Sequence, residues 1–398
     1  MDKIKALSYV YYKPGDVRLE EKEISCGSTD LLVKVKASAR CGTDKTIFYK
    51  GHYKVDSNAP IILGHELVGE IVYVGEKVKT LTEGIGYKEG QKLSKEYLNF
   101  EIGERATFQS RIARYLNGLL LLDNPITILS FYIDGGYSQY MKITKELVQS
   151  GSVFRLSPSI SDEEGALIEP AACALESIFS TPHPTGVDRD GYHIFRSGVK
   201  QGGKACVIGS GSVSMIYALL CKIEGSVKIY MIVRSEEKKE EVHRALGKDI
   251  NVIISPNYDD RPLEDKLEIE GRLVEKLKDM TDGELFDDVI AACPGADAQR
   301  LMLKLYNPGG YAVGACFGGT HALIDRANID ANHYCAAKTV GSSGCSNKTM
   351  ERIITLLETK KLSLKGFTSP KRYTFKTDPK EFFTTTEGGL KPVLYPWE

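Results

Sequence analysis

The chain has 398 residues, of which 42% are hydrophobic and 26% are charged, and its formal net charge is -1. This composition predicts a folded protein of two or three domains, and it excludes the basic surface of a nucleic-acid-binding protein. No apolar run reaches the roughly 20 residues that span a bilayer, and the N-terminus lacks a signal-peptide segment, so we expect a cytoplasmic protein without a membrane partner. The nine cysteines include no Cys-x-x-Cys pair, which favours free thiols in a reducing compartment.

Residues 1–160 have the pattern of a β-rich domain. The segments 31–37 and 69–75 are apolar with partial alternation and are bounded by turn residues, as expected of half-buried strands. Glycines are dense from Gly64 to Gly103, which indicates tight turns. A small barrel or folded sheet fits this pattern.

Residues 204–320 alternate between strand-like and helix-like segments, which predicts βαβ units and a parallel sheet. The expected strands are 204–208, 227–233, 288–293 and 310–314, and the expected helices are 236–246 and a surface helix within 259–282. The tail 391–394 is expected to return to the first domain.

A glycine turn follows the first of these strands and precedes an apolar helical pattern. A dinucleotide pyrophosphate can bind the N–H groups and positive dipole at such a helix start. Gly209 permits the tight turn and Gly211 permits close approach of the phosphates, whereas Ser214 replaces the third glycine of the fingerprint. A plain turn is the alternative, but the surrounding strands favour a cofactor site. The predicted cofactor-binding residues here are Gly209, Ser210, Gly211, Ser212 and Val213.

The second strand ends at Arg234 and Ser235, where an NAD-binding protein is expected to carry an acidic residue for the ribose hydroxyls. A guanidinium can instead pair with the 2′-phosphate of NADP. We therefore favour NADP over NAD, with a solvated strand-end arginine as the alternative.

Four possible metal ligands are scattered through the first half of the chain, namely Cys41, His65, Glu66 and Glu169. Zinc accepts sulfur, nitrogen and oxygen ligands, and a catalytic site keeps one position open. Taken singly, each residue has an ordinary explanation as a buried thiol, a core histidine or a surface carboxylate. Glu169 is different because it interrupts an apolar run, where a carboxylate needs a cation or a hydrogen-bond donor. Sequence spacing alone does not group the four.

These residues stand in motifs through which the chain resembles the medium-chain zinc-dependent alcohol dehydrogenases, particularly their polyol, sugar and threonine dehydrogenase branch. The matching segments are CGTD at 41–44, GHELVGEIVYVG at 64–75, GGYSQYM at 135–141, ALIEP at 166–170 and the Gly-Ser-Gly turn. The resemblance implies an α/β protein with a GroES-like β-rich catalytic domain and a Rossmann domain built on a doubly wound parallel sheet. The implied boundaries are 1–170 for the catalytic domain, 171–325 for the NAD(P)-binding domain and 326–398 for the return to the catalytic domain.

The resemblance also implies a function. Cys41, His65 and one glutamate, either Glu66 or Glu169, would bind one catalytic zinc, and Thr43 would pass on the substrate proton. The expected reaction is hydride transfer between NAD(P) and a polyol, sugar or sugar-phosphate alcohol. A homo-oligomer, a dimer or tetramer, is expected from the family.

Three features depart from the family pattern. The segment 103–134 contains no cysteine, so we expect no structural zinc there and a lobe that either is held by packing of Leu119–Leu122 or is partly mobile. Thr46 stands where relatives often have a histidine that ends the proton relay. The segment Pro182–Lys200 is longer than usual and is predicted to be a surface loop, with a cleft wall or an oligomer contact as alternatives.

Two other functions are alternatives to this one. A zinc-free quinone-type NADPH reductase lacks the metal cysteine and the Gly-His-Glu ligands. A non-catalytic dinucleotide-binding protein has no physical need for a thiol and carboxylates around one point. The combination of Cys41, Thr43, His65, Glu66 and Glu169 therefore argues against both.

Overall fold

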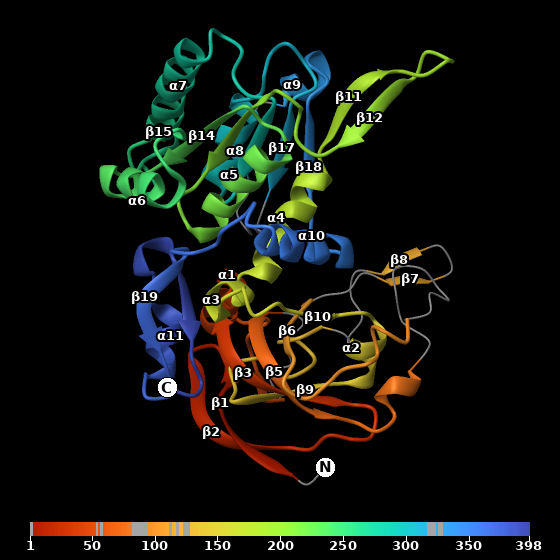
Figure 1. The fold of residues 1–398 in the computed structure, drawn as a ribbon. Coiled ribbons are helices and arrows are strands. Elements are labelled where there is room, and N and C mark those ends of the chain that lie inside the picture. The colour runs from red at the N-terminus through yellow and green to blue at the C-terminus, as the bar shows by residue number, and fades with distance from the viewer. Residues whose placement is uncertain are drawn as a thin grey trace. The chain divides into compact units, whose positions relative to one another are not determined.

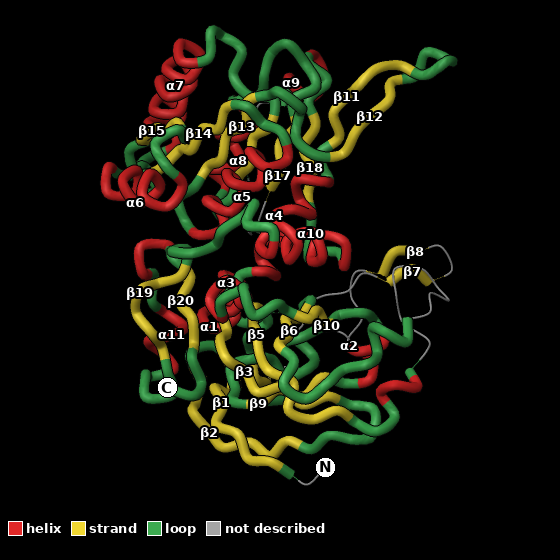
Figure 2. The backbone as a smooth tube through the Cα atoms, viewed as in Figure 1, coloured by secondary structure: helices red, strands yellow, loops and turns green. Residues whose placement is uncertain are grey.

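The computed structural model divides the chain into two compact units (Figures 1 and 2). Unit 1 contains residues 1–172 and 344–398, and unit 2 contains residues 173–343. The division into 1–170, 171–325 and 326–398 stays a prediction. The residues that the structure describes are 3–52, 55, 59–81, 94–110, 114–116, 119–121, 128–316, 324 and 329–398.

The main sheet of unit 1 has the strand order β10-β6-β5-β3-β20-β19, and β9 also pairs with β3. Its central strands are the apolar segments expected from the sequence, because 31–37 lies in β3 and most of 69–75 lies in β5. The C-terminal strand β20 pairs antiparallel with β3, which brings the end of the chain into this sheet. The strands are β3 (Leu31–Ala39), β5 (Glu66–Val74), β6 (Arg105–Phe108), β9 (Tyr140–Ile143), β10 (Val153–Arg155), β19 (Thr368–Tyr373) and β20 (Lys391–Leu394).

A second sheet of unit 1 has the order β2-β1-β4, and a short pair joins β7 to β8. The inward residues of the main sheet form a buried apolar core that includes Val33, Leu67 and Ile71. The remaining elements are β1 (Ile4–Lys13), β2 (Asp16–Ile24), β4 (Ile61–Ile62), β7 (Arg114–Leu116), β8 (Leu119–Leu121), α1 (Gly42–Lys50), the 3-10 turns η1 (Val78–Thr80) and η3 (Glu387–Gly389), α2 (Lys145–Gln149), α3 (Asp162–Ala166), α10 (Asn347–Glu358) and α11 (Pro379–Thr384).

Unit 2 is built on a six-stranded sheet of order β15-β14-β13-β16-β17-β18, in which every pair is parallel. The predicted α/β fold with a Rossmann-type sheet is thereby confirmed. Helix α5 packs against β13 and β14, and α8 packs against β16 and β17. The strands are β13 (Lys204–Ile208), β14 (Lys228–Val233), β15 (Asn251–Ile254), β16 (Asp288–Ala291), β17 (Val313–Cys316) and β18 (Lys338–Gly341). The helices are α5 (Ser212–Glu224), α6 (Glu236–Leu246), α7 (Leu263–Met280), α8 (Ala296–Lys304) and α9 (Asp330–Tyr334), and α4 (Ile168–Phe179) crosses from unit 1.

Two predicted segments differ from the structure. The strand expected at 310–314 begins only at Val313, because Gly310 and Tyr311 have positive φ angles and form the turn before it. The loop expected at 182–200 is an antiparallel hairpin of β11 (Pro182–Val187) and β12 (His193–Ser197). The hairpin is largely exposed, as expected of a surface loop, but its backbone hydrogen bonds make it a regular β-structure.

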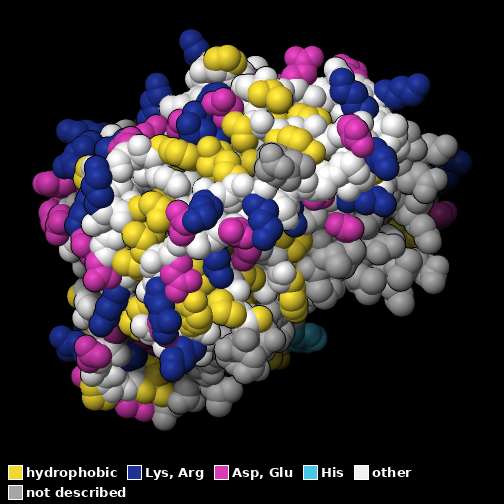
Figure 3. Space-filling view, turned by 90° about the horizontal axis from the view of Figure 1, so that it is seen from below, with side chains coloured by type: hydrophobic (Ala, Val, Ile, Leu, Met, Phe, Trp, Pro, Cys, Tyr) yellow, Lys and Arg dark blue, Asp and Glu magenta, His cyan; other side chains and the backbone are white. Residues whose placement is uncertain are grey.

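The proposed packing of Leu119–Leu122 concerns side chains outside the described residues. Within the described part of the chain, no helix has the length and apolarity needed to cross a membrane. On the face drawn in Figure 3, basic and acidic side chains are interspersed without a large area of one sign.

Candidate functional site

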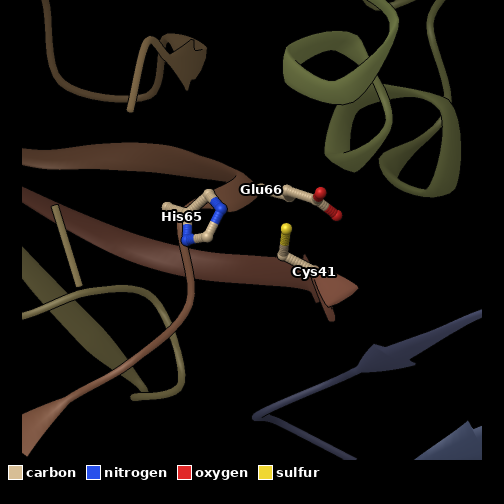
Figure 4. Close-up of side chains that lie close together, drawn as sticks. All are labelled: Cys41, His65 and Glu66. Atoms are coloured by element: carbon tan, nitrogen blue, oxygen red, sulfur yellow. The ribbon is translucent and has the colours of Figure 1, made fainter. Parts of the chain in front are cut away.

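Cys41, His65 and Glu66 lie together in unit 1 because β3 and β5 are antiparallel neighbours. Ala39, at the end of β3, pairs with Glu66 at the start of β5, which brings Cys41 beside that pair. One possible ligand atom from each of the three side chains lies within 4.8 Å of the other two. Figure 4 shows the Cys41 sulfur between the His65 ring and the Glu66 carboxylate. A thiol, an imidazole and a carboxylate at these separations form a set that zinc accepts.

Cys41 is also the N-cap of α1, so the local sequence fixes its position. Its Sγ accepts a hydrogen bond from the Thr43 N–H at 3.4 Å. The Asp44 carboxylate accepts one from the Cys41 N–H at 3.2 Å, which completes a reciprocal cap. Thr43 lies in the first turn of the helix, two residues after Cys41, and is half-buried.

A carboxylate lies behind the imidazole of His65. His65 Nδ1 is 3.6 Å from Asp44 Oδ1, and the Tyr137 hydroxyl donates to Asp44 Oδ2 at 2.6 Å. Burial lowers the pKa of His65, but Asp44, Cys41 and Glu169 together outweigh burial and hold that pKa well above its ordinary value. Metal-binding histidines commonly direct their second nitrogen at such a carboxylate, which fixes the ring. The surroundings of His65 therefore fit a metal ligand.

The turn before His65 depends on Gly64. Its φ is +96°, and a Cβ added there would lie 2.6 Å from the Tyr137 ring. The glycine of the Gly-His-Glu motif thus lets the backbone pass close to the aromatic ring that supports Asp44.

Lys391, in β20, is the residue of this site that the sequence analysis missed. Its ammonium lies 2.6 Å and 2.5 Å from the two carboxylate oxygens of Glu66, and both side chains are buried. Burial lowers the pKa of Lys391, but the nearby Glu66 and Cys41 raise that pKa by a larger amount. The net shift is upward, so the ammonium stays charged. A lysine that opens an otherwise apolar tail strand is the only sequence signal of this pairing.

Glu169 lies in the first turn of α4 and is buried. It accepts a hydrogen bond from the Ser110 hydroxyl. The structure does not include Glu169 in the group of Cys41, His65 and Glu66, but its charge raises the pKa of both His65 and Lys391. Glu169 is thus a neighbour of the three-residue group.

The glycine turn of unit 2 has the predicted strand–turn–helix arrangement. Gly209 follows β13 with a φ of +133°, and Gly211 is the N-cap of α5, whose first residues are Ser212 and Val213. A Cβ added to Gly209 would lie 2.5 Å from the Ser214 hydroxyl oxygen. Ser214 therefore packs directly beneath the turn, in the place of the third glycine. Ser210 lies in the turn between the two glycines.

Arg234 and Ser235 follow β14 in unit 2. The Arg234 guanidinium lies 4.4 Å above the Tyr258 ring and donates to the Pro256 carbonyl at 3.1 Å. It also lies 3.4 Å from a carboxylate oxygen of Asp259, a side chain that is mostly exposed. The Ser235 hydroxyl caps α6 by accepting the Lys238 N–H. Stacking on Tyr258 thus holds the guanidinium at the end of β14, and the Arg234 side chain remains partly exposed.

Comparison with known proteins agrees with this architecture. The family described as "Alcohol dehydrogenase GroES-like domain" matches residues 27–150. An (R,R)-butanediol dehydrogenase from Bacillus subtilis is 27% identical over 262 residues, which is 63% of each chain. A D-xylulose reductase from Saccharomyces cerevisiae is 26% identical over 394 residues, covering 96% of this chain and 95% of the yeast protein.

The fold agrees over nearly the whole length. The crystal structure of 2R,3R-butanediol dehydrogenase from Bacillus subtilis superimposes with a TM-score of 0.73 at 19% identity, covering 98% of this chain and 99% of the other. The expected GroES-like domain and Rossmann-type sheet are both confirmed. The chain thus contains an alcohol dehydrogenase GroES-like domain and is similar over nearly its whole length to alcohol and polyol dehydrogenases of the medium-chain zinc-dependent type.

Proposed function

We propose that this enzyme binds one zinc ion at Cys41, His65 and a glutamate and transfers hydride between NADP and a polyol, sugar or sugar-phosphate alcohol. The observation that carries the proposal is the grouping of a thiol, an imidazole and a carboxylate within 4.8 Å. These side chains are buried or half-buried, and Cys41 comes from a different segment of the chain than the adjacent residues His65 and Glu66. Relatives that act on butanediol and D-xylulose support a hydroxyl substrate of this class.

The charges around the group suit a divalent cation. Cys41, Glu66, Glu169 and Asp44 supply four acidic groups, and Lys391 contacts the Glu66 carboxylate. Buried carboxylates need a cation or hydrogen-bond donors to offset the loss of water. A zinc ion would supply positive charge at the point where the thiol and the imidazole converge.

Two carboxylates are placed to be the third ligand. Glu66 belongs to the three-residue group, but both of its oxygens contact Lys391. Glu169 lies outside that group and accepts a hydrogen bond from a neutral hydroxyl. Zinc content of Glu66→Gln and Glu169→Gln, measured side by side, assigns the ligand. The variant of the ligating residue should lose zinc, and the other should retain it.

The protein's own groups would handle the alcohol proton. A zinc ion bound there would supply a Lewis acid for the substrate alcohol, and NADP bound at the glycine turn would supply the hydride acceptor. We assign the Thr43 hydroxyl as the group that takes the proton, because its backbone is fixed to Cys41 Sγ at the start of α1. Thr46 is exposed, and its hydroxyl donates to the Gly42 carbonyl at 3.2 Å within the same helix. We therefore route the proton from Thr43 to solvent without Thr46.

The cofactor preference is assigned to Arg234. Its guanidinium, stacked on Tyr258, is available to pair with a 2′-phosphate, whereas a carboxylate at this position would repel one. The turn Gly209–Val213 and the start of α5 would take the pyrophosphate, because a helix N-terminus favours anions. Ser235, the N-cap of α6, would hydrogen-bond the same end of the cofactor.

A substrate screen combined with metal analysis tests the proposal. Sugars, polyols and their phosphates are offered with NAD and NADP to protein whose zinc content is known. We expect turnover of a polyol or sugar alcohol, preference for NADP and about one zinc per chain, since the 103–134 segment has no cysteine for a structural site. Zinc-free protein that reduces quinones, or protein that binds a dinucleotide without turnover, would contradict it. A homo-oligomer, dimer or tetramer, is part of the same proposal.

A further inference from the structure

The guanidinium of Arg234 is contacted by a short segment that follows the neighbouring strand of unit 2. Strands β14 and β15 are parallel, and Val233 at the end of β14 pairs with Ile254 at the end of β15. The carboxyl ends of parallel strands meet at one edge of a sheet, so the residues after β14 lie beside those after β15. The Ser255 N–H donates to the Val233 carbonyl at 2.8 Å and extends this pairing by one residue. Arg234 therefore lies against the segment 256–259.

Three groups of this segment contact the guanidinium in different ways. The Pro256 carbonyl accepts a hydrogen bond from Arg234 Nη1 at 3.1 Å, and the Tyr258 ring lies 4.4 Å from the guanidinium carbon. The Asp259 carboxylate accepts a hydrogen bond from Nη2 at 3.4 Å. A guanidinium has more N–H donors than these two hydrogen bonds use, so donors remain for a ligand. The carbonyl and the ring thus fix the position of the charge, whereas the carboxylate offsets it.

Tyr258 itself is held by a buried ion-pair network. The residue is 2% exposed, and its hydroxyl lies 3.4 Å from Glu270 Oε1, within hydrogen-bonding distance. Glu270, in α7, is fully buried and accepts hydrogen bonds from the Arg300 guanidinium at 2.6 Å and 3.1 Å. The Lys304 ammonium lies 2.7 Å from Glu270 Oε2. A buried carboxylate with two cationic partners has little freedom to move, so the ring beside it is a fixed support for Arg234.

Asp259 differs from Tyr258 because its contact with Arg234 is exposed. The Asp259 side chain is 63% exposed, and one of its oxygens lies 3.4 Å from Nη2. In the described part of the chain, no other cation forms an ion pair with this carboxylate. Exposed ion pairs contribute little to stability, so an incoming phosphate, which carries more negative charge, can displace the carboxylate. A displaced carboxylate stays close to the phosphate and repels it.

We propose that the segment 256–259 sets how strongly this protein prefers NADP over NAD. Tyr258 is a positioning residue that presents the Arg234 guanidinium to the 2′-phosphate, and Asp259 competes with that phosphate for the same N–H donors. The inference rests on the proposed assignment of Arg234 to the 2′-phosphate and adds two residues to it. Asp259 also offsets the charge of Arg234 when the dinucleotide has no phosphate there, so we expect NAD to bind with lower affinity.

Fluorescence titration of the full chain with NADPH and NADH tests the role of Tyr258. The measured quantity is the cofactor preference, defined as the dissociation constant for NADH divided by that for NADPH. Tyr258→Leu removes the ring and should lower this preference about three- to tenfold, as expected for loss of a cation–π contact. Tyr258→Phe keeps the ring and should retain a preference within about twofold of the wild type. A merely structural role would weaken binding of both cofactors equally, so an unchanged preference in Tyr258→Leu would overturn the proposal.

Asp259→Asn tests the competition from the opposite direction. Loss of the carboxylate charge should raise the cofactor preference about three- to tenfold, because a negative charge beside the phosphate is removed. Asp260→Asn is the matched control, since it removes the same charge one residue away, where the carboxylate has no ion pair with a described residue. The control should change the preference by less than about twofold. A preference that is lowered or unchanged in Asp259→Asn would show that this carboxylate does not compete.

Arg234→Ala separates this inference from the cofactor assignment on which it rests. If Arg234→Ala leaves the cofactor preference unchanged, the 2′-phosphate assignment fails and this inference fails with it. If Arg234→Ala abolishes the preference but Tyr258→Leu and Asp259→Asn keep the wild-type value, only the role of the segment 256–259 is wrong. In the Arg234→Ala background, Asp259→Asn should have no further effect. Thermal midpoints of Asp259→Asn and Asp260→Asn should match the wild type, because both side chains are exposed.

Discussion

The metal group of unit 1 and the glycine turn of unit 2 are built in opposite ways. Cys41, His65 and Glu66 lie together where the end of β3 meets the start of β5, and the Lys391 that contacts Glu66 is 325 residues further along the chain. The turn from Gly209 to Val213 is a single continuous segment between β13 and α5.

The difference lies in what each region requires of its residues. The turn needs particular backbone angles and little side-chain volume, as the φ of +133° at Gly209 illustrates. The metal group needs buried charges whose partners are brought together by strand pairing. Substitutions should therefore act through charge in the metal group and through backbone geometry in the glycine turn, and four experiments test the two units.

Removal of the thiol should have the largest effect. Cys41→Ala should lower kcat by at least about a thousandfold, because the Lewis acid contributes several kcal/mol and each 1.36 kcal/mol is tenfold in rate. Zinc content should fall with it, while the dissociation constant for NADPH should change little. Steady-state kinetics, elemental analysis and fluorescence titration measure the three quantities.

Cys26→Ala is the matched control for this experiment, because Cys26 is another thiol of unit 1, buried beside the Leu31 carbonyl. It should retain zinc and turnover. Full activity in Cys41→Ala would show that Cys41 is not needed as a metal ligand. The contrast between the two regions would then no longer hold.

Loss of the buried lysine should destabilise unit 1. Lys391→Met leaves the buried carboxylate of Glu66 without its cation and should lower the free energy of unfolding by about 3–5 kcal/mol. The double variant Lys391→Met/Glu66→Gln should recover most of this loss. Trp397, the only tryptophan of the chain, lies in unit 1, so its fluorescence in urea with chelator present reports this transition. Equal stability of the single variant and the wild type would show that the pair is not needed.

Arg234→Ala should act on one cofactor only. Hydrogen bonds to charged groups contribute about 1.5–3 kcal/mol, so KM for NADPH should rise by roughly 10- to 100-fold while KM for NADH stays nearly constant. Arg234→Lys keeps the charge but loses the planar fork stacked on Tyr258, and it should give an intermediate value. An equal rise for both cofactors would contradict the 2′-phosphate assignment.

Gly209→Ala should have the smallest effect, because it alters only the backbone of the turn. The strained φ and the close approach of Ser214 should shift the turn and weaken dinucleotide binding by about tenfold, or 1.4 kcal/mol. Gly202→Ala is the control, because its φ of +73° is also positive but no atom lies within 4 Å of the added Cβ. Gly202→Ala should reduce stability without changing cofactor affinity, and equal loss of affinity in both would contradict the turn assignment.

The sequence predicted the local elements well where their pattern was contiguous. Helix 236–246 and strand 204–208 have the same bounds in the structure as in the prediction. The strand at 310–314 was misplaced, because the positive φ of Tyr311 cannot be recognised from a residue type that rarely adopts it. The hairpin at 182–197 was missed because its strands hold prolines and glycine, which usually indicate a loop.

By itself, the sequence determined the alternation of strands and helices, the glycine turn and the motifs that contain Cys41 and His65, because each depends on residues close along the chain. Only the tertiary structure placed Cys41 and His65 close to Glu66. It also paired Lys391 with the Glu66 carboxylate and placed Glu169 near the group. The physical reason is that strand pairing joins segments far apart in sequence. The burial of a charge, and the partner that offsets it, follow from that pairing and leave almost no local pattern.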